Sequence, residues 1–194
     1  MNLFLIVAPV ILTVFYGIYF IKQLAMRSAG IRTDRLGRGE KPHAVAVQER
    51  VLAAVTALVA VVQYATVCCG GSVLPAAVPA LPWQVAGSVV GIVGVAYFAA
   101  AVAAMRRNWR AGIDAGQRTE LVVAGIYRFS RNPAFVGFDL MYVGFAMMWP
   151  DWPVIILSAA AVILFHLQIL REEEYLEGRF GDTYRDYRRR TWRY

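Results

Sequence analysis

Charged residues are scarce in this sequence: Lys, Arg, Asp and Glu make up 17% of its 194 residues, whereas soluble domains are near a quarter charged. Hydrophobic residues make up 59%, which excludes both a soluble domain of this size and intrinsic disorder. The sequence has only two cysteines, Cys68 and Cys69. Because they are adjacent, a disulfide-stapled secreted scaffold is excluded as well. A small integral membrane protein remains.

Three long segments contain almost no charge. Residues 1–21 and 51–105 have no charged side chain, and 132–170 contains only Asp139 and Asp151. A membrane-spanning helix needs about 20 apolar residues, and turn residues divide the second and third segments near Gly70 and Pro150. We therefore predict an all-α integral membrane protein, a single domain over 1–194. It has about five transmembrane helices, near 2–22, 50–69, 83–106, 134–149 and 153–177, and a C-terminal cytoplasmic tail, 178–194.

The fourth predicted helix has about 16 residues by this division, so the sequence leaves open whether it crosses the bilayer fully or forms half of a tight hairpin.

The 20 Lys and Arg residues lie in three segments, 22–50, 106–131 and 171–193. Five spans bring all three segments to one side of the membrane, and the positive-inside rule makes that side cytoplasmic. We therefore predict an N-terminus outside and a C-terminus inside. The net charge of +7 is expected to face anionic membrane lipid, and no nucleic-acid partner is expected.

Polar side chains gather in the loop 106–132, at the start of the fourth span and at the end of the fifth. Asn132 is a good N-cap and Pro133 suits a first helical turn, so a helix should begin there with free N–H groups that can hold a carboxylate. Glu172, Glu173 and Glu174 follow an apolar helix, where positive charge is preferred. They form either a solvated helix end or a ligand site, and the loop arginines either contact headgroups or belong to that site.

Two kinds of site are not expected. His166 has no second His or Cys at ligand spacing, so no metal site is predicted. No glycine-rich dinucleotide or phosphate-binding pattern is present.

Taken in order, the segments between Trp109 and Tyr187 resemble the isoprenylcysteine carboxyl methyltransferase family and its phospholipid methyltransferase relatives, in a short, prokaryote-like form with five spans. The similar parts are Leu121-Val122, Gly125-Ile126-Tyr127, Arg131-Asn132-Pro133-Ala134-Phe135, and Glu172-Glu173 before Leu176, Phe180-Gly181, Tyr184 and Tyr187. The sequence departs from the family pattern at Asn132, where a histidine is common. It departs again at Gln168, where the eukaryotic enzymes have an arginine proposed to face the substrate carboxylate.

The resemblance implies an S-adenosyl-L-methionine-dependent methyltransferase with a cytoplasmic cofactor-binding loop, acting on a lipophilic acceptor from the bilayer. Carboxyl methylation of an isoprenylcysteine-like group is the favoured reaction. The implied cofactor contacts are Ile113, Thr119, Glu120, Leu121, Val122, Tyr127, Asn132, Pro133, Ala134, Phe135 and Glu172. Arg131 and Gln168 are expected to contact the acceptor, and Arg131 and Glu173 are the expected catalytic residues.

Two alternatives stay open. A phospholipid or other lipid amine would have to lose a proton before methylation, which makes Glu173, His166 or Asp139 a candidate base. A non-enzymatic membrane adaptor that binds anionic lipid is the alternative of another class. It leaves the Glu172-Glu173 pair unexplained, and it predicts no binding of S-adenosyl-L-methionine.

Overall fold

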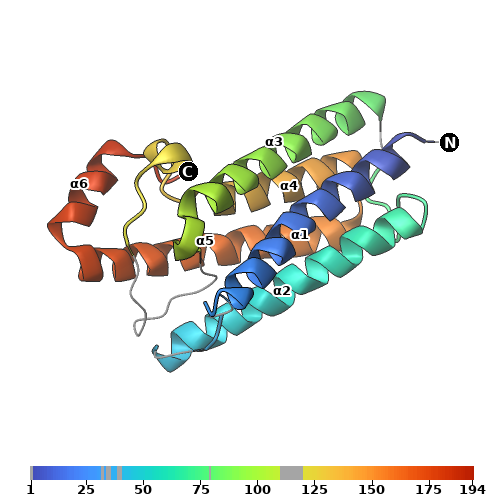
Figure 1. The fold of residues 1–194 in the computed structure, drawn as a ribbon. Helices are drawn as coiled ribbons and strands as arrows, with labels where there is room; N and C mark the ends of the chain where they lie inside the picture. Colours follow the sequence, from blue (N-terminus) through green and yellow to red (C-terminus); the bar gives the residue numbers. More distant parts are fainter. Residues whose placement is uncertain (1, 32, 34–35, 39–40, 79, 110–119) are drawn as a thin grey trace.

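Four helices of the structure are long and apolar enough to cross a bilayer: α1 (Phe4–Ser28), α2 (His43–Cys68), α3 (Leu81–Met105) and α5 (Trp152–Phe180). The structure is a computed structural model that describes residues 2–31, 33, 36–38, 41–78, 80–109 and 120–194. A shorter apolar helix, α4 (Pro133–Met148), packs among the four (Figure 1). The prediction of an all-α integral membrane protein is confirmed.

The helix α4 has 16 residues, which gives a length of about 24 Å. The hydrocarbon core of a bilayer is about 30 Å thick, so α4 is shorter than the core.

Several helices extend beyond the spans expected from charge alone. The helix α1 continues past Lys22 to Ser28, and α2 begins at His43. Long charged side chains are good helix formers, so a helix continues past the last apolar residue. Within the predicted tail, α5 ends at Phe180 and α6 (Asp182–Arg190) folds back beside it (Figure 1).

Glycines bring α3 and α4 into backbone contact. A Cβ atom on Gly144 of α4 would lie 2.5 Å from the backbone N of Gly91 and 2.6 Å from the carbonyl of Gly87, both on α3. A Cβ atom on Gly94 would lie 2.7 Å from the backbone N of Met141. Small residues at a helix interface permit this approach in membranes, where dispersion contacts drive helix association. The glycines therefore fix α4 against α3.

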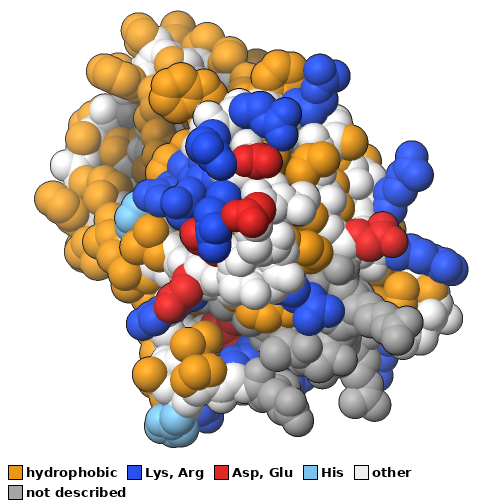
Figure 2. All heavy atoms as spheres, turned by 90° about the vertical axis from the view of Figure 1, so that its left-hand side faces the viewer, with side chains coloured by type: hydrophobic (Ala, Val, Ile, Leu, Met, Phe, Trp, Pro, Cys, Tyr) orange, Lys and Arg blue, Asp and Glu red, His pale blue; other side chains and the backbone are white. Residues whose placement is uncertain are grey.

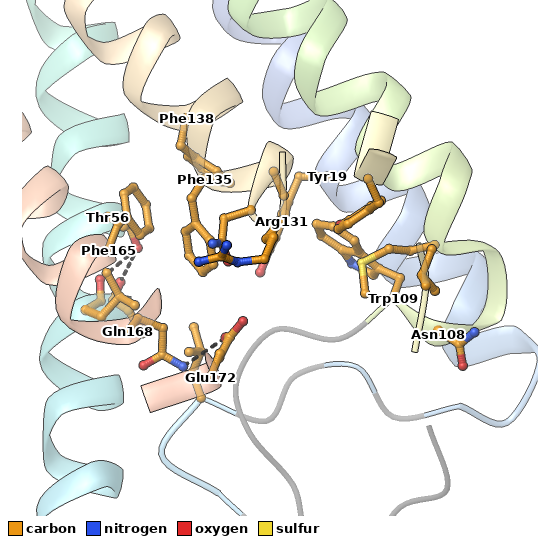
Figure 3. Close-up of a pocket in the computed structure, with 18 of the residues that line it drawn as sticks. Tyr19, Thr56, Asn108, Trp109, Arg131, Phe135, Phe138, Phe165, Gln168 and Glu172 are labelled. Carbon is orange, nitrogen blue, oxygen red and sulfur yellow. Dashed lines mark hydrogen bonds between the residues drawn. The ribbon is translucent and has the colours of Figure 1, made fainter. Parts of the chain in front are cut away.

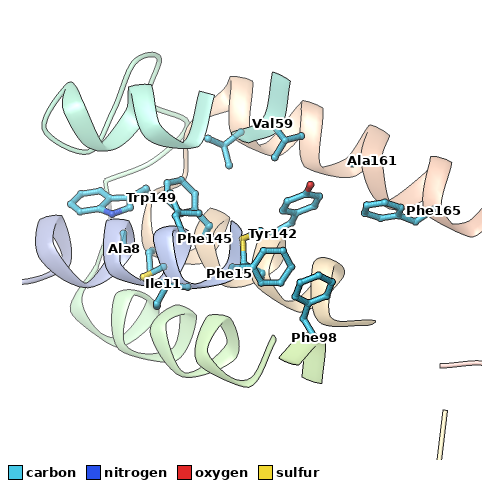
Figure 4. Close-up of a cluster of buried hydrophobic side chains, with 14 of the residues drawn as sticks. Ala8, Ile11, Phe15, Val59, Phe98, Tyr142, Phe145, Trp149, Ala161 and Phe165 are labelled. Atoms are coloured by element: carbon cyan, nitrogen blue, oxygen red, sulfur yellow. The ribbon is translucent and has the colours of Figure 1, made fainter. Parts of the chain in front are cut away.

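Aromatic side chains fill the centre of the bundle (Figure 4). The rings of Phe15 on α1 and Phe98 on α3 are stacked, with centroids 4.5 Å apart. The Phe138 ring on α4 is edge-on to that of Phe98, with centroids 5.1 Å apart. It is tilted against the Phe165 ring on α5, with centroids 5.2 Å apart. These contacts connect α1, α3, α4 and α5 through one aromatic cluster. The cluster holds the first turns of α4 against the middle of α5.

Asp151 organises the bundle end opposite α6. Its carboxylate is fully buried and accepts hydrogen bonds from the backbone N–H of Val73 and, at 3.1 Å, of Leu74. The backbone N–H of Trp152 in turn donates to the Leu74 carbonyl at 3.0 Å. The Asp151 carboxylate therefore joins the connection after α2 to the turn between α4 and α5.

We expect Gly144→Ala to lower the stability of the fold by about 1–3 kcal/mol, because the added methyl group overpacks a backbone contact. Thermal unfolding in detergent measures the loss. Gly178→Ala is the matched control, since a Cβ atom there meets nothing within 4 Å. Equal unfolding temperatures for the two variants would contradict the tight contact between α3 and α4.

Candidate active site

A cavity of about 740 Å³ lies at the α6 end of the bundle, between α1, α2, α4 and α5. Its polar end is formed by Asn108, Asn132, Gln168 and Glu172. Figure 3 shows Asn108, Gln168 and Glu172 with neighbouring aromatic side chains around one space. Its volume is within the usual range for sites of small molecules and cofactors.

The cavity continues from its polar end toward the apolar part of the bundle. Along α2 its lining runs from Leu52 to Tyr64, which is about 18 Å of helix. Thr13 and Phe20 of α1 and Ala57 of α2 line it and are exposed. The apolar part of the cavity therefore opens toward lipid between α1 and α2.

Two polar contacts join α1 to α2 at the far end of this opening. The Tyr16 hydroxyl donates to Gln63 Oε1 at 2.8 Å, and the hydroxyls of Thr13 and Tyr64 are 3.2 Å apart. The opening is thus bounded by hydrogen bonds inside an otherwise apolar helix pair.

Gln168 joins two carboxylates at the polar end. Its Nε2 donates to Glu172 Oε1 and to Glu49 Oε1, both at 3.1 Å. Glu49 lies on α2, is fully buried, and forms an ion pair with Lys41. The Oε1 atom of Gln168 is buried without a hydrogen-bond partner among the described residues. It is therefore an acceptor oxygen suited to a ligand that brings an N–H or O–H group.

Glu173 lies behind the cavity and holds two arginines. Its Oε1 accepts from Arg131 Nη2 at 2.7 Å and from Arg131 Nε at 3.2 Å, and its Oε2 accepts from Arg193 Nη2 at 2.9 Å. The hydrogen bond to Glu173 raises the pKa of Arg193 above its usual value. The same Arg131 donates from Nη1 to the carbonyls of Thr191 at 2.7 Å and Arg188 at 3.1 Å. Arg131 therefore connects the start of α4 to α5 and to the C-terminal segment.

Asn132 is the N-cap residue of α4, as expected. Asn132 precedes α4, but its side chain makes no capping hydrogen bond. Its Nδ2 instead donates to the Arg193 carbonyl at 3.1 Å, so the side chain is turned toward the C-terminal segment. Pro133 does begin the helix, and the first-turn residues Ala134 and Phe135 line the cavity. The first N–H groups of a helix have no intrahelical acceptor, so the positive end of α4 lies at the cavity.

Ten of the fourteen predicted site residues line the cavity, from four separate segments: Glu120, Leu121, Val122, Tyr127, Arg131, Asn132, Ala134, Phe135, Gln168 and Glu172. Pro133 and Glu173 do not line it. Ile113 and Thr119 lie outside the described residues. The structure thus brings most of the predicted residues together, while their individual roles stay predictions.

Tyr127, Tyr184 and Tyr187 form an aromatic wall of the cavity. Burial raises the pKa of all three hydroxyl groups, that of Tyr184 to about 12. The Tyr187 hydroxyl donates to the Tyr127 carbonyl at 2.6 Å, which attaches α6 to the short helix η2 (Gly125–Arg128). These phenols stay neutral and are suited to stacking and hydrogen bonding.

Sequence reasoning missed the walls that α1 and α2 contribute. Tyr16, Tyr19 and Thr56 line the cavity but lie in apolar stretches without a motif. Glu49 was missed because its partner Gln168 is 119 residues away in the chain, and its ion-pair partner Lys41 was missed with it. A carboxylate two residues before the long uncharged segment 51–105 was the available signal for Glu49.

A family model described as phospholipid methyltransferase matches residues 83–183, just over half of the 194 residues. The chain belongs to this family. The match to the phospholipid methyltransferase family runs from α3 through α4 and α5 into the start of α6. It contains the loop, the α4 start and the carboxylates of the cavity, whereas α1 and α2 lie outside it.

One curated relative is the protein-S-isoprenylcysteine O-methyltransferase of Schizosaccharomyces pombe, which is 37% identical to the chain over 72 residues. These residues are 37% of this chain, and they cover only 30% of that relative's length. No solved structure matches the chain. The chain is therefore a helical membrane protein of the phospholipid methyltransferase family.

We expect Glu173→Gln to destabilise the C-terminal segment by about 3 kcal/mol, because it leaves the buried guanidinium of Arg131 without its counter-charge. Limited trypsin cleavage after Arg188, Arg189 and Arg190 should become faster, and thermal unfolding in detergent should begin earlier. Glu174→Gln is the control, because Glu174 is exposed and its ion pair with Arg171 is a surface contact at 3.6 Å. Identical cleavage rates in both variants would contradict a structural role for Glu173.

Proposed function

We propose that this protein transfers a methyl group from S-adenosyl-L-methionine to a lipophilic acceptor that enters its cavity from the bilayer. The observation that carries the proposal is the cavity itself, which joins the polar residues of the family segment to an apolar opening between α1 and α2. A polar methyl donor needs the polar residues, and a lipid tail needs the apolar opening. An adaptor that only binds headgroups needs neither.

The residues present fit the cofactor. S-adenosyl-L-methionine supplies an activated methyl group on a sulfonium cation and offers a carboxylate, an ammonium, a ribose diol and an adenine for recognition. The first turn of α4, at Ala134 and Phe135, suits the carboxylate. Glu172 and the Gln168 oxygen suit the ammonium or the ribose hydroxyls, and Leu121 with the Tyr127 ring suits the adenine.

For the acceptor we propose the carboxylate of an isoprenylcysteine-like group, as the name of the fission yeast relative indicates for that protein. A carboxylate is ionised at neutral pH, so the protein has to align it and exclude water rather than remove a proton. In this proposal Glu173 is not a base, because both of its oxygens accept from arginines. Arg131 acts as a positioning residue, since it already makes four hydrogen bonds to protein atoms.

A second candidate acceptor is a lipid amine, and the acidic polar end favours it. Gln168 presents an oxygen there, and its amide nitrogen is committed to Glu49 and Glu172. The Gln168 oxygen and the Glu172 carboxylate attract an ammonium and repel an acceptor carboxylate, whereas the Glu49 charge is paired with Lys41. Gln168, where the eukaryotic enzymes of the family have an arginine, therefore favours an amine acceptor over a carboxylate.

Transfer of radiolabelled methyl groups in reconstituted vesicles distinguishes the two acceptors. We expect label in a prenylcysteine analogue with a free carboxylate and none in its methyl ester. Label in phosphatidylethanolamine alone would establish the amine reaction instead. Failure of the protein to bind S-adenosylhomocysteine would contradict both reactions and favour the adaptor.

We expect Glu172→Gln to weaken S-adenosylhomocysteine binding by about 1–3 kcal/mol, the usual loss when a charge-assisted hydrogen bond becomes a neutral one. Isothermal titration calorimetry in detergent measures the affinity. Glu174→Gln should keep the affinity of the unaltered protein because Glu174 does not line the cavity. Equal losses at both positions would show that only bulk negative charge matters.

We further propose that the cavity lies at the cytoplasmic face, because all basic segments lie on that side in a five-span topology. In a background with Cys68 and Cys69 replaced by Ala, a cysteine at Gly181 should react with a membrane-impermeant maleimide only after permeabilisation. A cysteine at Ser72 should react in intact cells. The reverse pattern would invert the topology.

A further inference from the structure

Three exposed aromatic side chains lie together where the C-terminal segment returns to the bundle. Trp192 is 81% exposed and Phe129 is 70% exposed, and Tyr194 is half exposed. Ser130 and Trp192 pair as an isolated β-bridge, and the Arg131 N–H donates to the Trp192 carbonyl at 2.8 Å. Two adjacent backbone segments therefore present Phe129 and Trp192 outward, and neither ring contributes to the core.

The same segment continues along the membrane-facing side of α5. The Tyr194 ring stacks on His166, with centroids 6.1 Å apart, and its hydroxyl meets His166 Nδ1. His166 precedes Arg171, the first charged residue after the apolar part of α5, by five residues, or about 7 Å of helix. Its neighbours Ile163 and Leu167 are exposed. The aromatic patch is therefore continuous with the lipid-facing surface of α5.

Basic side chains border the patch. Arg128 directly precedes Phe129 in the chain, Arg189 and Arg190 precede Trp192 by two or three residues, and all three are exposed. Figure 2 shows Lys and Arg gathered over this end of the molecule. Aromatic rings with Arg at their edge are typical of the level where hydrocarbon meets headgroups, and arginines there attract anionic lipid at about 1 kcal/mol each.

We propose that Phe129, Trp192 and Tyr194, with the bordering arginines, form a docking surface for the anionic headgroup layer of the surrounding bilayer, and that docking stabilises the start of α4. The carbonyls of Trp192 and Arg193 accept from Arg131 and Asn132, so anything that holds the C-terminal segment holds one wall of the cavity. Anionic lipid is thereby a regulator of the site. Docking to the headgroup layer does not depend on the proposed reaction.

The location of the patch is tested by spin labelling in vesicles of phosphatidylcholine containing one third phosphatidylglycerol. With Cys68 and Cys69 replaced by Ala, a label at Trp192→Cys should relax more with oxygen, which concentrates in lipid, than with a water-soluble nickel chelate. A label at Asp182→Cys is the control, because the Asp182 side chain is 90% exposed, and it should show the reverse. A label at 192 that behaves like the one at 182 would overturn the proposal, and it would leave the surface open to a soluble partner.

The coupling is tested by hydrogen exchange of the peptide containing Arg131. In vesicles with phosphatidylglycerol its exchange should be about tenfold slower than in phosphatidylcholine alone, because local opening is suppressed. The double variant Phe129→Ser, Trp192→Ser should lose this difference. Trp83→Ser, an exposed tryptophan at the opposite end of the bundle, should keep it. Equal exchange in both lipids for the unaltered protein would overturn the coupling. Neither measurement uses methyl transfer or cofactor binding.

Discussion

The ion pair between Glu173 and Arg131 is the interaction on which the cavity end of the protein depends. Both side chains are buried, and they are separated by 42 residues in the chain. A buried ion pair destabilises the fold unless its remaining donors are hydrogen-bonded. Here Arg131 donates its remaining N–H groups to carbonyls of the C-terminal segment. One arginine thus holds α4, α5 and the chain after α6 in a single arrangement, and that arrangement creates the cavity wall.

The cavity that results has two chemically different ends. The family segment supplies the helix start, the loop at Leu121 and the carboxylate of Glu172, whereas α1 and α2 supply the apolar walls. The glycine contact between α3 and α4 keeps the short helix α4 in place inside the bundle. A polar ligand and a lipid tail can therefore meet at one point, as the proposed methyl transfer requires.

The sequence predicts the helical membrane fold well because the signal is long and additive: uncharged segments of spanning length alternate with basic ones. It predicts much of the polar end of the cavity because those residues follow one another along the chain. It fails where a partner is distant. The sequence predicts that the Asn132 side chain caps α4, but this side chain donates a hydrogen bond to the distant Arg193 carbonyl instead. Glu49 carries no local signal of its contact with Gln168.

The central claim is that the cavity is the site of the cofactor, and a solved structure of the protein with S-adenosylhomocysteine tests it most directly. The account predicts density between the Leu121 segment, the first turn of α4 and Glu172, with the homocysteine sulfur facing the opening between α1 and α2. Density for the ligand elsewhere, with the cavity filled only by lipid or water, would contradict it.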